Sequence, residues 1–580
     1  MTATPALVDG EKSEHTSAPG LLDAKSDPGS THAPLTPPDV ASEKESGKNT
    51  TKDDDESPEK PVRDDATPGE YPSGLRLIFI IVALVLGIFL VSLDLTIVAT
   101  AIPKITSEFH GLDDVAWYSA AFFMTIGGFQ SAWGKAYKYF PLKRTFLLSI
   151  FVFELGSLIC GVAPSSTTLI VGRAVAGLGA AGIGSGTYTI IAFSASPKTR
   201  PMFTGIIGTS YGIAAVVGPL IGGVFADKVS WRWCFYINLP IGAISASIIL
   251  VFFKTPSAAK PRSASVREKL MQMDPVGVIL VMGAVISYIL ALHYARQIHP
   301  WNSSLVVGLL VGFVALTAAF ATWEWCQEDR AMVPYRLAGQ RVYLVPSVFA
   351  FFFSGAYFLI IYFLPLYFQS IDNVSAAMSG VRNLPLILTV TISMLASGAY
   401  ISITGIAAPI TVVGTALGVV CMGLLYTLDI DTSEGKWIGY QVIGGVAWGI
   451  ASQIPIITVQ ATASASDLPE VTAILLFFQT VGGAFMVSAA QSAFVNVLIK
   501  ALPRTAPGVN SAIVVLTGAT DLRKAFSPDV LPGILEAYMR GLKISFAIGL
   551  AATGVAFIII TLFQKWNRLN TAAIAGGAEA

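Results

Sequence analysis

Three ionisable residues lie deep inside long apolar stretches of this chain: Asp94, Glu154 and Arg173. A charge at the centre of a bilayer costs on the order of 3 kcal/mol, and such residues usually mark ion or substrate pathways. A carboxyl group that is alternately buried and exposed near an arginine can bind and release a proton, because burial favours its neutral form and the guanidinium its charged form. The three residues therefore predict a proton-carrying site. The alternative is a buried pair that only holds helices together.

Composition indicates that membrane-spanning helices position these residues. Hydrophobic residues make up 53% of the 580 residues and charged residues 13%, against about 25% charged in soluble domains. A helix that crosses the hydrocarbon needs about 20 apolar residues. The sequence predicts fourteen such spans, at 77–101, 115–134, 145–163, 168–191, 204–226, 233–253, 275–295, 304–324, 343–367, 379–399, 405–427, 437–459, 471–497 and 542–564. We therefore expect an all-α polytopic protein embedded in the lipid bilayer.

Loop charges predict the orientation. Sixteen Lys and Arg lie in the loops assigned to the cytoplasm, against six in the first six outside loops, which places both termini in the cytoplasm. Residues 1–70 hold 16 Asp/Glu against 7 Lys/Arg and no apolar core, so they predict a disordered acidic tail and no signal peptide. A second cytoplasmic tail is expected at 565–580. Sequons at Asn302 and Asn373 lie in outside loops and predict glycosylation there.

The fifth predicted span has small residues at regular spacing and one helix-breaking residue. Its candidate residues are Gly208, Gly212, Gly218, Pro219, Gly222 and Gly223. Glycines four residues apart open one helix face to a close neighbour, and a proline removes a backbone donor and favours a kink. This combination predicts a kinked, closely packed helix that takes part in conformational change of the bundle.

Polar and aromatic side chains within the spans are candidates for lining a substrate cavity. An amide that faces lipid is unfavourable, and aromatic rings suit a bulky apolar ligand. The candidates are Gln130, Tyr357, Phe358, Tyr362, Gln441, Gln453 and Gln479. The alternative for each aromatic residue is contact with lipid or the membrane interface.

Several function classes find no support. The four cysteines are scattered and the five histidines form no HExxH pattern, so neither a metal site nor an enzyme is expected. No Gly-x-x-x-x-Gly-Lys-Ser/Thr loop is present, which argues against an ATP-driven pump. No filter-like repeat suggests a channel.

Four segments resemble the major facilitator superfamily, and within it the fourteen-span drug:proton antiporters of fungi. These segments are LDLTIVATAIP from Leu93, RAVAGLGAA from Arg173, the glycine-rich stretch Gly208–Gly223 and WRWCFYINLPIG from Trp231. The resemblance implicates Arg173 in proton transfer and identifies Gly208–Gly223 as the antiporter motif.

Two positions depart from the family's pattern. In the loop after the second span, Lys138 stands where the superfamily usually has Asp, so an Asp-dependent gating interaction cannot be carried over. In the fourth span, Ala176 stands where many members have Gln.

The resemblance implies an architecture. It consists of a six-helix half at 75–253, a cytoplasmic linker with two central spans at 254–324, and a six-helix half at 343–564 that contains a long outside loop at 498–541. The substrate site would lie between the halves, which rock against each other.

The resemblance also implies a function. We expect a monomeric plasma-membrane antiporter that exports small lipophilic drugs, toxins or secondary metabolites in exchange for protons. It would need no cofactor beyond the proton gradient and no nucleic-acid partner. The alternative in the same fold is an importer or a vacuolar transporter of amino acids or iron chelates.

Overall fold

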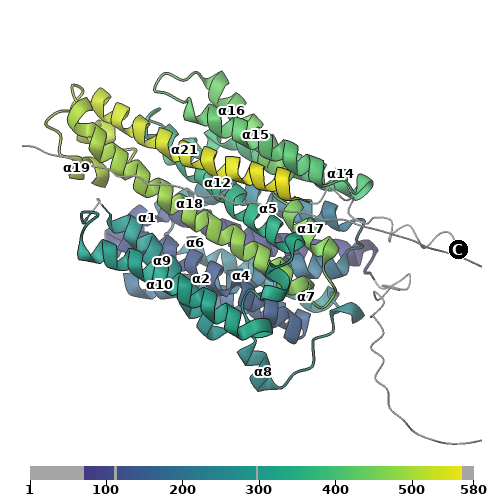
Figure 1. The fold of residues 1–580 in the computed structure, drawn as a ribbon. Helices are drawn as coiled ribbons and strands as arrows, with labels where there is room; N and C mark the ends of the chain where they lie inside the picture. The colour runs from purple at the N-terminus through teal and green to yellow at the C-terminus, as the bar shows by residue number, and fades with distance from the viewer. Residues whose placement is uncertain (1–70, 110–113, 296–297, 565–580) are drawn as a thin grey trace, which may run out of the picture. The chain divides into compact units, whose positions relative to one another are not determined.

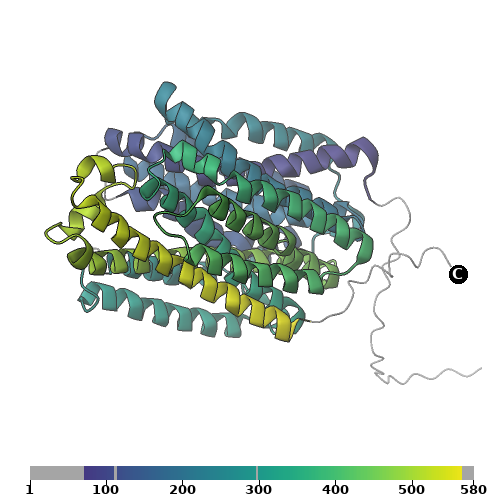
Figure 2. The same ribbon diagram turned by 90° about the horizontal axis from the view of Figure 1, so that it is seen from above.

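A computed structural model describes residues 71–109, 114–295 and 298–564 of the chain (Figure 1). Within these ranges the secondary structure is helical and contains no β-strand. The helices run side by side, as the second view shows (Figure 2). The two tails predicted at 1–70 and 565–580 lie outside the described residues.

Thirteen helical segments of the described chain are long and apolar enough to cross a membrane, which confirms a polytopic all-α fold. They correspond to thirteen of the fourteen predicted spans. The remaining predicted span is occupied by α2 (Val115–Tyr139), which has 25 residues and is long enough to cross. Its composition is less apolar because Trp, Tyr, Ser and Gly residues recur along it. It also carries Lys135 and Lys138, both of which are buried against other parts of the protein.

The first half of the chain forms one helical bundle. Helix α4 packs between α2 and α3, while α1 packs against α5 and α7. A break at Ile237 separates the short α6 from α7. Besides α2, the bounds are α1 (Gly74–Phe109), α3 (Leu142–Gly161), α4 (Ser166–Ser194), α5 (Arg200–Lys228), α6 (Trp233–Tyr236) and α7 (Asn238–Phe252).

The second half forms a corresponding bundle around α12 and α18, which pack on each other and on α21. Its helices are α12 (Arg341–Ser370), α13 (Ala376–Arg382), α14 (Leu384–Thr404), α15 (Ala408–Tyr426), α16 (Glu434–Ala451), α17 (Ile454–Thr462), α18 (Leu468–Thr505), α19 (Ser511–Leu516), α20 (Leu522–Ala525) and α21 (Leu531–Phe563). The loop expected at 498–541 is shorter than predicted, because α18 and α21 both continue beyond their apolar parts into segments that contain Lys500 and Arg540.

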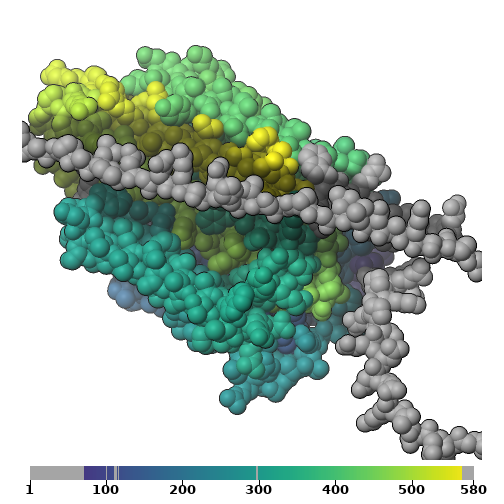
Figure 3. All heavy atoms as spheres, viewed as in Figure 1, coloured from purple at the N-terminus to yellow at the C-terminus, as the bar shows by residue number. Residues whose placement is uncertain are grey.

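A central segment connects the two halves. It contains η2 (Ser257–Ala259), α8 (Val266–Met271), α9 (Pro275–Tyr294), α10 (Ser304–Gln327), η3 (Glu328–Arg330) and α11 (Tyr335–Ala338). Helix α9 packs on α2 and α18, one from each half, and α10 packs on α9. The space-filling view shows the teal atoms of this segment on the viewer's side (Figure 3).

The bundle has two ends, and we name each after one residue. The Lys138 end is where α1 begins and α2 finishes; the Trp231 end is where α1 finishes, since the rings of Phe109 and Trp231 lie 5.7 Å apart. The halves meet along two seams, one between α2 and α18 and the other between α5 and α14. Helix α9 covers only the first seam.

Candidate functional site

The structure joins two of the three predicted proton-coupling residues in a buried ion pair. Asp94 on α1 and Arg173 on α4 are 0% and 1% exposed, and an Nη atom of Arg173 donates a hydrogen bond to Asp94. The Nε–H of Arg173 donates to the carbonyl of Tyr118, 2.8 Å away. Its guanidinium carbon also lies 4.3 Å from the ring centre of Phe122. The carboxylate that balances the charge of Arg173 comes from α1, while α2 supplies a carbonyl and an aromatic ring and α6 adds the ring of Phe235, 5.9 Å away.

Glycines of α4 allow this pair to form. A Cβ at Gly177 would lie 2.4 Å from the carbonyl oxygen of Phe122 on α2, and one at Gly179 would lie 2.2 Å from the amide nitrogen of Phe153 on α3. Any larger residue would push these backbones apart. The fourth-span motif thus brings α4 between its neighbours and holds Arg173 in the bundle interior.

Asn238 is a member of this site that sequence reasoning missed. It is completely buried at the start of α7, and its Nδ2 donates to Oδ1 of Asp94 at 3.2 Å and to Oγ of Ser157 at 3.1 Å. The available signal was an amide side chain within an apolar stretch, the same signal that the glutamines of the spans give. Asn238 therefore connects α1 to α3.

Glu154 lies in the same region but outside the pair. Both carboxyl oxygens are buried and have no hydrogen-bond partner within the described residues. The carboxyl group lies against α7, where a Cβ at Gly242 would be only 1.8 Å from Oε1. The third predicted residue is therefore close to the ion pair and not part of it.

The antiporter motif contacts two different partners. A Cβ at Gly208 would lie 2.2 Å from Sδ of Met394, and one at Gly212 would lie 2.7 Å from Oγ1 of Thr391, both on α14 of the other half. Gly218 instead faces α1, where its Cβ would be 2.1 Å from Oγ1 of Thr96. A Cβ at Gly223 would meet nothing within 4 Å.

The two remaining motif positions also lie on α5. Pro219 lies inside the helix, and the carbonyl of Gly222 lies 3.9 Å from Sγ of Cys234. The motif therefore divides into one part that packs on the opposite half and one that packs within its own half.

A second cluster of charges joins the two halves at the Lys138 end. Nζ of Lys138 lies 2.9 Å from Oδ1 of Asp467 and 2.6 Å from Oε2 of Glu470, at the start of α18. Arg336 donates two hydrogen bonds to Asp467 at 3.0 and 2.9 Å. Although burial raises the pKa of Asp467, these hydrogen bonds from Arg336 and Lys138 hold it below its usual range. Lys138, where the family's pattern has Asp, thus has acidic partners in the other half.

Lys135 extends this cluster to the central segment. Its Nζ lies 3.2 Å from Oε1 of Glu470, 3.3 Å from Oε1 of Gln272 before α9 and 2.5 Å from the carbonyl oxygen of Asp329 after α10. The central spans are therefore tied to the contact between the halves.

Two buried carboxyl groups hold the central segment together. Asp274 and Glu324 both accept a hydrogen bond from the backbone N–H of Met332, at 3.1 and 3.3 Å. Glu324 also accepts from the N–H of Val333 at 2.7 Å. These carboxyl groups bind backbone donors, unlike Glu154.

The glutamines predicted to line a cavity differ in the hydrogen-bond partners of their amides. Gln130 is buried and donates to Oγ of Ser185 at 2.7 Å, within the first half. Gln441 is buried and bonds the backbone of Arg382 and Leu386 at the junction of α13 and α14. Both amides thus connect helices within one half.

Gln453 lies at the break between α16 and α17, and its Oε1 accepts from the hydroxyl of Tyr188 on α4 at 3.4 Å. Gln479 is half-buried on α18. Gln453 is therefore the candidate whose amide bridges the halves.

The aromatic candidates lie on α12. The ring of Phe358 lies 6.4 Å from that of Phe123 across the interface, and Tyr357 lies 6.0 Å from Trp448 within the second half. Tyr362 is 51% exposed. Phe358 therefore lies at the interface and Tyr357 packs within the second half, whereas Tyr362 faces outward.

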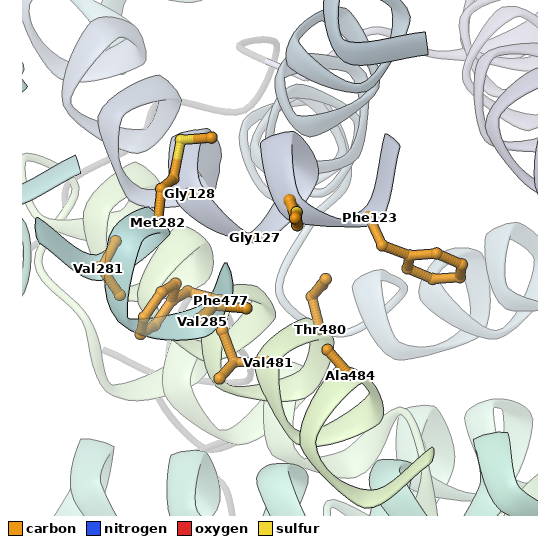
Figure 4. A pocket seen from close by; sticks show the side chains of 11 residues that line it. Phe123, Gly127, Gly128, Val281, Met282, Val285, Phe477, Thr480, Val481 and Ala484 are labelled. Carbon is orange, nitrogen blue, oxygen red and sulfur yellow. The ribbon is translucent and has the colours of Figure 1, made fainter. Parts of the chain in front are cut away.

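A pocket lies where α2, α9 and α18 meet (Figure 4). Met282 of α9 occupies the notch at Gly128, where a Cβ would lie 2.4 Å from Cγ of Met282. Phe123, Phe477 and other apolar side chains line the pocket. The central span therefore seals this seam with hydrophobic contacts.

The two sequon residues are exposed. Asn302 precedes α10 and Asn373 follows α12, so both lie at the Trp231 end. Among the described residues no group of His, Cys, Asp and Glu could hold a metal ion.

Two helical bundles that meet at a central interface are an arrangement found in secondary transporters. A model of the Major Facilitator Superfamily matches residues 84–487, and the chain belongs to this family. It is therefore a multi-pass membrane protein of a transporter family.

Similar proteins come from fungi. The chain is 54% identical to the MFS-type transporter grgE of a Penicillium species over 523 residues, which cover 90% of this chain and 91% of that one. It is 52% identical to the probable efflux pump gsfJ of Penicillium aethiopicum, over 86% of this chain and 89% of that one. The solved structure of the proton:xylose symporter XylE matches with a TM-score of 0.55 at 11% identity, covering 86% of this chain and 98% of that one, and shows the fold alone.

Proposed function

We propose that this chain is a proton-coupled efflux transporter that exports small lipophilic compounds, such as drugs, toxins or fungal secondary metabolites. The similarity to a probable efflux pump supports export. The buried pair of Asp94 and Arg173 is the single observation that carries proton coupling. The chain would act in the plasma membrane as a monomer, without a cofactor and without catalysing a chemical reaction.

Asp94 is the proton carrier in this proposal. Because Arg173 cannot release its proton in practice, only the carboxyl group of the pair changes charge. Protonation of Asp94 removes the electrostatic attraction and leaves Arg173 with the carbonyl of Tyr118 and the ring of Phe122. The change in charge therefore alters how α1 and α4 are held together, with Glu154 as a further candidate for the same coupling.

Rocking of the two halves would expose the substrate site first to one side of the membrane and then to the other. The loop charges assign the Lys138 end to the cytoplasm, and the ion pairs of Lys138 with α18 close this end in the present conformation. Cargo would enter from the cytoplasm after these pairs separate. Tyr188 and Gln453, which meet between the halves, would then become accessible to it.

Inside-out plasma-membrane vesicles from yeast expressing the chain test this proposal, with the lipophilic dye rhodamine 6G as the probe. A pH gradient that is acidic inside should drive dye uptake, and a protonophore should abolish it. Asp94→Asn should lose the gradient-driven uptake, whereas Asp529→Asn, which changes an exposed carboxyl group, should keep it.

Two outcomes would contradict the proposal. Uptake that occurs only in right-side-out vesicles would indicate an importer. A fluorescent fusion found only at the vacuole would contradict the plasma-membrane location.

A further inference from the structure

We infer that Glu154 is a second proton-binding site, and that its carboxyl group carries a proton in this conformation while Asp94 is paired with Arg173. Gly242 and Asn238 of α7 build this site together with Glu154 on α3. A role of this second site in transport rests on the proposed proton coupling. One transport cycle would then exchange two protons, one at each carboxyl group.

The surroundings of Glu154 favour the neutral form. Both of its oxygens are buried without a hydrogen-bond donor among the described residues. An ionised carboxylate without a partner in an apolar interior is very unfavourable, so the group takes up a proton instead. The guanidinium of Arg173 does not compensate Glu154, because it is already bonded to Asp94 and Tyr118.

Among the described residues, the charged and titratable groups around Glu154 add no compensating cation. On α1 the group that acts on Glu154 is Asp94, a second carboxyl group that adds repulsion. On α6, Cys234 is buried, and the hydroxyl of Tyr236 donates to the carbonyl of Gly161. The buried residues of helix α7 are Asn238, Gly242, Ser245 and Ile249, none of which is charged.

Gly242 provides the space for the carboxyl group. A Cβ at this position would lie 1.8 Å from Oε1 and 2.6 Å from Cδ of Glu154. No other residue type leaves this notch open, so the glycine is required for Glu154 to keep its present position.

Asn238 connects the two carboxyl sites. It lies one helical turn before Gly242, and its Nδ2 donates to Asp94 and to Ser157, which lies one turn after Glu154. Its Oδ1 is buried and has no donor within the described residues. Asn238 therefore bonds Asp94 directly and, through Ser157, the helix that carries Glu154.

The proton itself follows a simple balance. A proton from water adds to one oxygen of the Glu154 carboxylate and forms the neutral acid. Release breaks the same O–H bond, returns the proton to water on the other side and leaves the carboxylate. No other reactant is needed.

Infrared spectroscopy of the purified protein in lipid tests the inference without any cargo. A protonated carboxyl group without a hydrogen bond absorbs at the high-frequency end of the C=O stretching region, apart from ionised carboxylates. The wild-type protein at neutral pH should show this band. Glu154→Gln should lose it, and Gly242→Ala should shift it, because the added Cβ displaces the carboxyl group.

Control variants identify the source of the band. Glu324→Gln should retain it, since it removes a carboxyl group that is bonded to backbone donors. Glu328→Gln changes an exposed side chain and should also retain it. A band that persists unchanged in Glu154→Gln, or no such band in the wild-type protein, would overturn the inference.

A transport measurement tests the second proton. In proteoliposomes with the membrane potential held at zero, the logarithm of the rhodamine 6G accumulation ratio rises linearly with the pH gradient, with a slope equal to the number of protons exchanged. Glu154→Gln should halve this slope, and an unchanged slope would contradict the two-proton cycle. If the wild-type protein moves no dye at all, the proposed function fails, whereas the infrared result is unaffected.

Discussion

The two charged clusters of this protein differ in what they join. Asp94, Arg173 and Asn238 all belong to the first half, and none of them is more than 1% exposed. Lys138 and its acidic partners Asp467 and Glu470 lie on opposite halves. When the halves rock, the first cluster can persist as a unit, but the second must break. The cluster of Asp94 and Arg173 is therefore suited to gaining and losing a proton. The cluster of Lys138 is suited to closing the Lys138 end of the bundle.

The largest expected effect comes from breaking the buried pair. Arg173→Met should abolish proton-driven transport and lower the free energy of unfolding by about 3–5 kcal/mol, because it leaves the charge of Asp94 buried and uncompensated. Thermal unfolding of the purified protein and dye transport measure the two effects. Adding Asp94→Asn should restore stability but not transport. A double variant that regains gradient-driven transport would contradict a role of this pair in coupling.

The cross-half cluster should respond differently. Lys138→Glu places three acidic groups together and should cost the closed arrangement about 2–5 kcal/mol. A cysteine introduced near the interface should become accessible to thiol reagents from the Lys138 end, whereas the stability of the first half changes little. The swapped pair of Lys138→Glu with Glu470→Lys should restore only part of the closure, because Lys135 and Asp467 keep their charges beside the exchanged residues. Unchanged accessibility in Lys138→Glu would remove this cluster from the closure mechanism.

A smaller effect should arise at the glycine contact between the halves. Gly208→Leu should slow transport, because its side chain would collide with Met394 and Gln453, whose flexible ends can only partly move aside. Gly223→Leu is the matched control on the same helix, since a Cβ there meets nothing within 4 Å. Initial rates of dye uptake compare the two variants. Equal rates would show that close approach of α5 and α14 is not needed for the cycle.

The smallest effect concerns pH. Because its pKa is lowered by Arg336 and Lys138, Asp467 stabilises the closed arrangement above the ordinary pKa of about 3.9, and this contribution is lost only as the pH falls through the lowered value. Closure should thus be constant from neutral to mildly acidic pH. Arg336→Ala should move the loss of closure to higher pH, as cysteine accessibility can measure. A strong pH dependence near neutrality in the wild-type protein would contradict this assignment.

Much of the bundle follows from the sequence, since thirteen predicted spans correspond to helices of sufficient length and apolarity. Hydropathy underestimates helices whose ends are polar, which is why α18 and α21 extend into the loop predicted at 498–541. It also does not predict the break in the span at 437–459, where Gln453 separates α16 from α17. Both differences arise because hydropathy measures whether a segment prefers lipid or water. It does not show where a helix ends or breaks.

The sequence by itself determined that Asp94, Glu154 and Arg173 are buried in a membrane bundle, because apolar residues surround each of them along the chain. It also indicated that Gly208 and Gly212 mark a close contact. Only the tertiary structure decided that Arg173 pairs with Asp94 and leaves Glu154 without a partner, and that Lys138 meets acidic groups more than 300 residues away in the chain. Pairings of this kind depend on which helix faces which, and helix packing is set by side-chain shape across many positions.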